Sequence, residues 1–279
     1  MPRSPIALAV PVLVVALVPF AASADSGHDP LPRERVLDQT EIPVYGYRIV
    51  ETYPHATSSY TEGLVMVDGE LYEGTGLYGH SRLRHNELST GEAIREVALQ
   101  PTDFGEGVTV IGDRVYQLTY LHNTGFIYDR ASFERIGTFR YITQGWGLTT
   151  DGESLIMSDG SSALLWLDPE TFEPVRHVFV HDDVGPVGFI NELEYVDGTI
   201  YANVWQTDFI AAIDAETGKI EAWIDLTGLN PDPERLVYPY VLNGIAHDAA
   251  TGHLLVTGKE WPHMWAIDLV PRRADGSGG

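Results

Sequence analysis

The chain has 279 residues, 44% hydrophobic and 20% charged, which is typical of a globular protein rather than a disordered or fibrous one. Its 17 basic and 40 acidic residues give a formal net charge of −23, so we expect no nucleic-acid partner, because such a surface repels phosphates. The absence of cysteine excludes disulfides, thiolate nucleophiles and cysteine-ligated zinc.

The chain begins with the features of a secretory signal peptide at residues 1–24. Arg3 gives a short positive start, residues 6–20 are largely apolar, and Ala22-Ser23-Ala24 suits a cleavage site. A membrane anchor is the alternative, but this apolar run is shorter than a bilayer-spanning helix needs. We expect cleavage after Ala24, a secreted or periplasmic protein, and no stable membrane insertion after cleavage.

Two segments lack the pattern of a packed element. Residues 25–42 are mostly polar and contain prolines, and residues 271–279 end in a tail rich in glycine and serine. We predict that residues 25–42 are a flexible leader, that residues 271–279 are a flexible tail, and that residues 43–270 form one folded domain.

A short phrase recurs five times in this domain. Its copies are Glu62-Gly63-Leu64, Glu106-Gly107-Val108, Trp146-Gly147-Leu148, Asn191-Glu192-Leu193 and Asn243-Gly244-Ile245. The copies are 40 to 52 residues apart, and each is followed by a turn containing glycine and by further apolar strand patterns. Five units of short strands at this period predict an all-β fold, a five-bladed β-propeller with four antiparallel strands per blade.

The ring of this propeller needs a strand from the N-terminus. The last unit lacks a fourth strand after Ile267, whereas an unassigned β-like run, residues 43–50, precedes the first unit. We predict that this N-terminal strand completes the last blade and closes the ring. A β-sandwich is the alternative, but sandwiches do not repeat one phrase five times.

Strand pairing within such blades brings distant residues to one end of the propeller. In each blade the start of the first strand lies beside the end of the second. These positions hold Glu62, Glu106, Trp146, Asn191 and Asn243 at the starts, and Gly76, Tyr120, Gly160, Trp205 and Lys259 at the ends. Carboxylates, amides, an ammonium and large aromatic side chains in one mouth are typical of a ligand pocket.

Each of these residues also has a purely structural alternative. The tryptophans could fill the channel, the asparagines could cap turns, the glutamates could be rim charges, and Lys259 could pair with a surface acid. The ten histidines show no spacing typical of metal ligands, so we expect no metal at the site. The central channel could still hold a structural cation.

Eight ordered phrases resemble the plant and bacterial type of glutaminyl-peptide cyclotransferase. They are Tyr60–Leu64, Glu73–Gly79, Phe104–Thr109, Gln144–Leu148, Asn191–Tyr195, Tyr201–Trp205, Leu242–Ala246 and Val256–Lys259. The resemblance extends from about Val44 to Leu269. It implies a five-bladed propeller, in agreement with the repeat count, and an enzyme that requires no zinc or other cofactor.

The resemblance also implies a reaction. The α-amine of an N-terminal glutamine in a peptide or protein attacks its own side-chain amide carbon, which releases ammonia and leaves pyroglutamate (5-oxoproline). Glu106 would be the general acid/base, and Asn191 and Lys259 would hold the amide and stabilise charge on its oxygen. The substrate-binding residues implied are Tyr60, Glu62, Tyr120, Trp146, Trp205 and Asn243. We expect a monomer that acts on such peptides.

Three positions depart from the family pattern. Tyr60 stands in place of Phe, Glu62 in place of Gln, and Tyr120 in place of Trp. A second carboxylate near Glu106 would raise the pKa of one of the two, because like charges resist joint ionisation. Glu62 could therefore shift the pH optimum, strengthen binding of the substrate amine or change the specificity.

Two other functions fit some of these residues. A calcium-dependent lactonase or hydrolase propeller could use the oxygens of Glu62, Glu106, Asn191 and Asn243, although tryptophan and lysine are poor neighbours for a cation. A non-catalytic propeller would bind peptides without releasing ammonia. Loss of activity with a chelator would favour the first, and binding without turnover would favour the second.

Overall fold

The computed structural model describes residues 31–233, 235 and 240–272. These residues form twenty β-strands and one short helical turn, η1 (Arg35–Gln39), so the fold is all-β, as predicted. None of the helical structure in the described residues is long and apolar enough to cross a membrane. The predicted signal peptide, residues 25–30 of the predicted leader and residues 273–279 of the predicted tail lie outside the described residues.

Three groups of four consecutive strands form separate antiparallel sheets. The first sheet contains β2 (Thr61–Val67), β3 (Glu70–Thr75), β4 (Arg82–Asn86) and β5 (Ala93–Ala98). The second contains β6 (Gly105–Ile111), β7 (Arg114–Thr119), β8 (Thr124–Asp129) and β9 (Arg135–Arg140). The third contains β10 (Leu148–Thr150), β11 (Leu155–Ser158), β12 (Ala163–Leu167) and β13 (Pro174–Phe179). Four antiparallel strands per repeat are therefore confirmed for these three repeats.

The other eight strands form one sheet in the order β14-β15-β16-β17-β1-β20-β19-β18. One half contains β14 (Ile190–Val196), β15 (Thr199–Val204), β16 (Phe209–Asp214) and β17 (Ile220–Asp225). The other half contains β18 (Leu242–Asp248), β19 (His253–Gly258), β20 (His263–Pro271) and β1 (Val44–Pro54). The N-terminal strand β1 pairs antiparallel with β20, as predicted.

The structure has four sheets instead of the five predicted, because β1 also pairs with β17. This pairing is parallel and covers two positions, Val44↔Trp223 and Tyr45↔Ile224. Pairing of β1 with β20 reaches only from Tyr45, opposite Pro271, to the end of β1. The first residue of β1 therefore lies beyond its antiparallel partner and bonds to the neighbouring group of strands.

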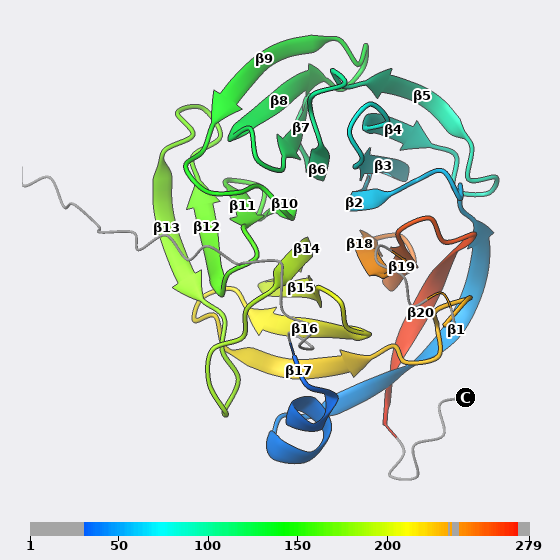
Figure 1. Cartoon of the computed structure of the whole chain (residues 1–279), viewed down its shortest axis with the longest axis vertical. Coiled ribbons are helices and arrows are strands. Elements are labelled where there is room, and N and C mark those ends of the chain that lie inside the picture. Colours follow the sequence, from blue (N-terminus) through cyan, green and yellow to red (C-terminus); the bar gives the residue numbers. More distant parts are fainter. Residues whose placement is uncertain (1–30, 234, 236–239, 273–279) are drawn as a thin grey trace, which may run out of the picture.

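The sheets surround a common centre (Figure 1). The first strands of the five repeats, β2, β6, β10, β14 and β18, lie nearest the centre, and β5, β9, β13, β17 and β1 lie at the periphery. Each first strand contacts the next, from β2 through β6, β10 and β14 to β18, and β18 contacts β2 again. Side chains at the ends of these strands can therefore face one another across the centre.

The repeated glycine is explained by how closely the first strands approach. A side chain at Gly107 would overlap the backbone of Gly147 and Leu148, and a side chain at Gly147 would overlap the carbonyl oxygen of Asn191. Because these neighbours are backbone atoms of adjacent strands, they cannot turn away. Glycine is therefore required here by packing.

The two ends of the strands have different connections. At one end the strands are joined by short turns such as Asp68-Gly69 and Asp197-Gly198, in which both residues have positive φ, as two-residue hairpin turns require. At the other end some connections are long, for example residues 180–189 between β13 and β14. The predicted mouth lies at this end, where binding residues are most often found.

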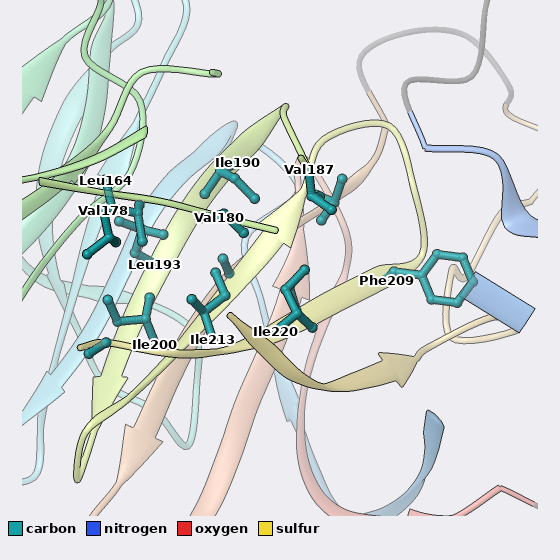
Figure 2. Close-up of a cluster of buried hydrophobic side chains, with 14 of the residues drawn as sticks. Leu164, Val178, Val180, Val187, Ile190, Leu193, Ile200, Phe209, Ile213 and Ile220 are labelled. Carbon is teal, nitrogen blue, oxygen red and sulfur yellow. The ribbon is translucent and has the colours of Figure 1, made fainter. Parts of the chain in front are cut away.

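Aliphatic and aromatic side chains fill the space between adjacent sheets. Figure 2 shows one such cluster, in which Leu164 and Val178 from β12 and β13 lie near Leu193 and Ile200 from β14 and β15. These side chains are at most 8% exposed. Packing of this kind fixes the angle between neighbouring groups of strands and thus the position of the strand ends.

Part of the predicted flexible leader is packed against the domain, which corrects that prediction for residues 31–42. Leu31 and Val36 are buried in the same cluster as Leu164 and Leu193, and η1 contains Val36. The Arg35 guanidinium binds the buried Asp182 carboxylate at 2.6 and 2.9 Å. The polar composition of the segment concealed these two apolar anchors and the ion pairs of Arg33 and Arg35.

Candidate active site

Four of the five first strands have a register shift at the predicted site residue. The pairing of β2 with β3 skips Glu62, and the pairing of β6 with β7 skips Glu106. The same shift occurs at Asn191 in β14 and at Asn243 in β18. Shifts of this kind re-aim a side chain, and here they recur at equivalent positions in four repeats.

Backbone hydrogen bonds hold the end of each second strand beside these residues, as the strand count predicted. The N–H groups of Gly76 and Tyr120 donate to the carbonyls of Tyr60 and Phe104. Equivalent bonds join Trp205 to Phe189 at 2.9 Å and Lys259 to Val241 at 2.9 Å. In all four repeats the acceptor lies two residues before the predicted site residue of the first strand.

Two carboxyl groups and one ammonium meet in the interior of this mouth. Nζ of Lys259 lies 2.6 Å from Oε1 of Glu62, and both side chains are almost fully buried. The Glu62 carboxylate accepts a hydrogen bond from the carboxyl group of Glu106. Nδ2 of Asn243 donates to the Thr61 carbonyl at 2.9 Å and lies 3.4 Å from Oε2 of Glu62.

The two carboxyl groups differ in their electrostatic surroundings. Burial raises the pKa of Glu106 well above its ordinary value, and the nearby Glu62 charge raises it further. Burial also raises the pKa of Glu62, but the Lys259 ammonium opposes this effect. The arrangement favours a proton on Glu106 and a negative charge on Glu62, so the site at rest holds one carboxylic acid beside an ion pair.

Aromatic rings line the mouth on both sides of the acids. Lys259 Nζ lies 4.6 Å from the centre of the Tyr60 ring, and Phe104 contacts the rings of both Tyr60 and Tyr120. On the other side, Trp146 and Trp205 meet edge to face with ring centres 5.6 Å apart. A backbone hydrogen bond joins the two sides: the N–H of Gly107, which follows Glu106, donates to the carbonyl of Trp146 at 2.8 Å.

Asn191 brings a hydrogen-bond acceptor to the site and no titratable group. Its side chain is buried and its Oδ1 atom has no hydrogen-bond partner among the described residues. Its backbone carbonyl accepts from the Ser158 hydroxyl at 2.7 Å, which fixes the residue beside Gly147. A buried, unpaired acceptor is costly unless a ligand supplies a donor.

The chain is similar in sequence and in structure to known proteins. Residues 13–269 match the glutamine cyclotransferase family. The chain is 36% identical over 271 residues to a glutaminyl-peptide cyclotransferase of Arabidopsis thaliana, covering 95% of this chain and 82% of that protein. It superimposes on the crystal structure of the glutaminyl cyclase of Myxococcus xanthus with a TM-score of 0.78 and 34% identity, covering 84% of this chain and all of that one.

The chain belongs to the glutamine cyclotransferase family. It is therefore an enzyme, as the sequence resemblance implied. Among the three departures that the sequence resemblance implied, Glu62 has the largest electrostatic consequence, because it lies against both Glu106 and Lys259. Tyr60 and Tyr120 keep the aromatic character of the walls.

Sequence reasoning missed Phe104 as a site residue. Its ring lies between Tyr60, Tyr78 and Tyr120, and it occupies the space that a side chain at Gly76 would need. The repeat contained the signal, because Phe104 precedes Glu106 by two residues just as Tyr60 precedes Glu62. An aromatic residue at this position in both copies predicts a shared wall.

The central carboxylate Glu192 was also missed. It occupies the position at which the other four phrases have glycine, and it is fully buried. Its two oxygens accept hydrogen bonds from the backbone N–H groups of Leu64 in β2 (3.0 Å) and Ile245 in β18 (2.7 Å). Glu192 thus ties three first strands together, which is a structural role.

A buried ionic network supports the acidic side of the mouth. The Glu73 carboxylate lies 2.9 Å from His55 Nε2 and accepts hydrogen bonds from Ser59 and Thr61, the residue before Glu62. His55 contacts the Trp261 carbonyl at 2.7 Å, close in sequence to Lys259. The network therefore fixes the backbone on both sides of the Glu62–Lys259 pair.

The described residues contain no group of three or more histidine, aspartate or glutamate side chains arranged to hold a metal ion. The predicted site residues instead form one connected set. Glu62, Glu106, Lys259, Asn243 and Tyr60 are joined by the contacts above, whereas Tyr120, Trp146, Trp205 and Asn191 are linked to that set through ring contacts and adjacent backbone.

Proposed function

We propose that this enzyme converts the N-terminal glutamine of peptides or proteins to pyroglutamate with release of ammonia. The observation that carries the proposal is the buried Glu62–Glu106–Lys259 cluster at the mouth of a chain of this family. The relatives' names state the same activity for those proteins. The cluster has no net charge, because Lys259 balances Glu62, and Glu106 holds one exchangeable proton. Such a site suits a reaction in which one proton is accepted and one is donated.

The fold that we propose for this site is a five-bladed propeller. The eight-stranded sheet divides naturally into β14–β17 and β18–β20 with β1, because only two residue pairs of β1 and β17 join the halves. The closed series of contacts among the five first strands also supports this description. The central ends of these strands would then form the substrate cup.

The chemistry needs a proton to leave the attacking amine and a proton to reach the leaving group. The α-nitrogen forms a bond to the side-chain amide carbon, and the bond from that carbon to its amide nitrogen breaks. A carboxylate of the Glu62–Glu106 pair accepts one proton from the α-nitrogen, and Glu106 donates one proton to the departing nitrogen, which leaves as ammonia. The pair ends with the same number of protons as at the start.

Other side chains of the cup would hold the substrate in the cyclising geometry. The unpaired Oδ1 atoms of Asn191 and Asn243 suit the N–H groups of the substrate. Lys259 carries the positive charge nearest to the pair and would stabilise negative charge on the amide oxygen. Tyr60, Tyr120, Trp146 and Trp205 would exclude water and hold the side chain folded toward the amine.

We propose that residues 1–24 direct export, so that the mature protein is secreted or periplasmic, and that it acts as a monomer. We also propose that no cofactor or metal is needed, since the ammonium of Lys259 supplies the positive charge. A structural cation in the central channel is compatible with this chemistry.

The experiment is incubation of the purified protein with a glutamine-initiated peptide, followed by mass spectrometry and an ammonia assay. We expect loss of one ammonia per peptide, with unchanged rate in EDTA. Matched peptides that begin with asparagine or with N-acetylated glutamine should not react. Binding without ammonia release would indicate a peptide-binding protein instead, and complete loss in EDTA would indicate a metal-dependent enzyme.

A further inference from the structure

A cavity of about 590 Å³ lies beside the candidate active site, at the end of the strands where the mouth is. We call it the side cavity. Its lining includes the nearly buried apolar residues Phe209 and Leu242 and the polar residues Thr207, Asp208 and Thr227. The site described above uses none of these five side chains, so the side cavity has no role in the proposed reaction itself.

The side cavity and the mouth share two stretches of backbone. Gln206 and Thr207 of the cavity wall directly follow Trp205. Val241 and Leu242 of the opposite wall directly precede Asn243, and the Val241 carbonyl accepts a hydrogen bond from the N–H of Lys259. The side cavity therefore borders the mouth along both stretches.

Two arginines of the cavity wall are held in ion pairs. Arg33 is bound to the Asp225 carboxylate at 3.0 Å and to the Thr227 hydroxyl, and Arg235 is bound to Glu260 at 2.6 Å. The Asp208 carboxylate, in contrast, has neither a hydrogen bond nor an ion pair with any residue that the structure describes. Partial burial and the Asp225 charge raise the pKa of Asp208, the Arg33 charge partly opposes them, and a cationic ligand would lower this pKa further.

We propose that the side cavity binds a lysine or arginine side chain of the peptide substrate, with the cationic group on Asp208 and the aliphatic stem along the cavity wall. Long basic side chains combine these two characters, an apolar stem and a charged head. The strongly acidic chain also favours the approach of a basic peptide. This inference rests on the proposed function, because the peptide enters the side cavity only when its N-terminal glutamine occupies the mouth.

The reach of the chain limits which residue of the substrate is recognised. Asp208 follows Trp205 by three residues, so their Cα atoms are at most about 11 Å apart. An extended peptide advances about 3.3–3.6 Å per residue. A basic residue at the third to fifth position of the substrate therefore matches the side cavity, whereas one at the tenth position does not.

The test compares peptides that differ in one residue. The panel starts from Gln followed by alanines and places a single lysine, norleucine or glutamate at each position from two to ten. For the wild-type enzyme we expect kcat/KM about tenfold higher with lysine than with norleucine at one of positions three to five, and a smaller ratio at high salt. Asp208→Asn should abolish the ratio and leave turnover of the all-alanine peptide unchanged.

The matched control is Asp113→Asn, which removes the same charge from an exposed turn at the opposite end of the strands. This variant should keep the lysine preference. A wild-type enzyme that turns over the all-alanine peptide without any lysine preference, or a preference that survives Asp208→Asn, overturns the side-cavity assignment. No turnover of any glutamine peptide instead overturns the proposed function, so the two failures are distinguishable.

Discussion

The carboxyl groups of Glu62 and Glu106, which lie on adjacent first strands, form one hydrogen-bonded pair that the Lys259 ammonium balances from the Glu62 side. Two like charges in contact cannot both ionise without a large energetic cost. The pair therefore titrates as a unit, and its proton resides on Glu106 because Lys259 stabilises the charge on Glu62.

Replacing Glu106 with glutamine should remove the proton donor and keep the shape of the site. We expect Glu106→Gln to lower kcat by about 10²–10⁴, the usual range for loss of a general acid/base. Ammonia release under saturating substrate measures the effect, and an unchanged thermal midpoint verifies that the fold is intact. Near-normal turnover by the folded variant would exclude Glu106 from the proton transfers.

Replacing Glu62 with glutamine should change the pH dependence more than the fold. The negative charge of Glu62 raises the pKa of Glu106, so its removal lowers that pKa. The limb of the kcat/KM profile that depends on protonated Glu106 should therefore move to lower pH, by about one unit or more. The control is Glu153→Gln, an exposed acid in the β10–β11 turn, whose profile should match the wild type. Identical profiles for Glu62→Gln and wild type would contradict a shared proton.

The His55–Glu73 network should make stability depend on pH in a defined window. The pKa of Glu73 is lowered to about 2, chiefly by its protonated His55 partner against the effect of burial. Its stabilisation is thus present above the unfolded value near 4.5 and is lost as the pH falls toward 2. The pKa of His55 is raised by Glu73, so its contribution is complete below the unfolded value near 6.5 and is lost at higher pH.

Glu73→Gln should therefore destabilise the protein most between about pH 4.5 and 6.5. We expect a loss of about 3–5 kcal/mol in the free energy of unfolding there, as for a broken buried ion pair, and a smaller loss near pH 2. Urea unfolding at several pH values measures this dependence. Glu96→Gln is the matched control, because Arg84 lies near both Glu73 (3.9 Å) and Glu96 (3.5 Å), but Glu96 is half exposed. Equal losses in the two variants would rule out a special contribution from the buried network.

A methyl group at Gly147 should separate the first strands. It would overlap the Asn191 carbonyl, which is backbone and cannot rotate away. We expect Gly147→Ala to lower the free energy of unfolding by about 1–3 kcal/mol or more, and to reduce activity because Asn191 moves with its strand. Gly46→Ala in β1, where the new atom would only touch Val270 at 4.0 Å, should be near neutral. Urea unfolding of both variants makes the comparison, and equal stability would mean that close strand approach does not explain the glycine.

The sequence alone determined the number of repeats, the strand content and the end of the strands at which the site lies. These follow from local signals: a recurring phrase, turn residues at regular intervals and a strand period of two, all of which act over a few residues. Strand counting also paired Glu62, Glu106, Asn191 and Asn243 with the correct second strands, because antiparallel pairing leaves little freedom of register.

Only the tertiary structure decided which of these side chains touch one another. The short distance from Glu62 to Lys259, the hydrogen bond from Glu106, the Phe104 wall and the anchoring of residues 31–42 depend on contacts between segments far apart in the chain. The pairing of β1 with β17, which joins two groups of strands into one sheet, is also a contact between segments far apart in the chain. Such contacts depend on the packing angle between sheets, and no local pattern in the sequence encodes that angle.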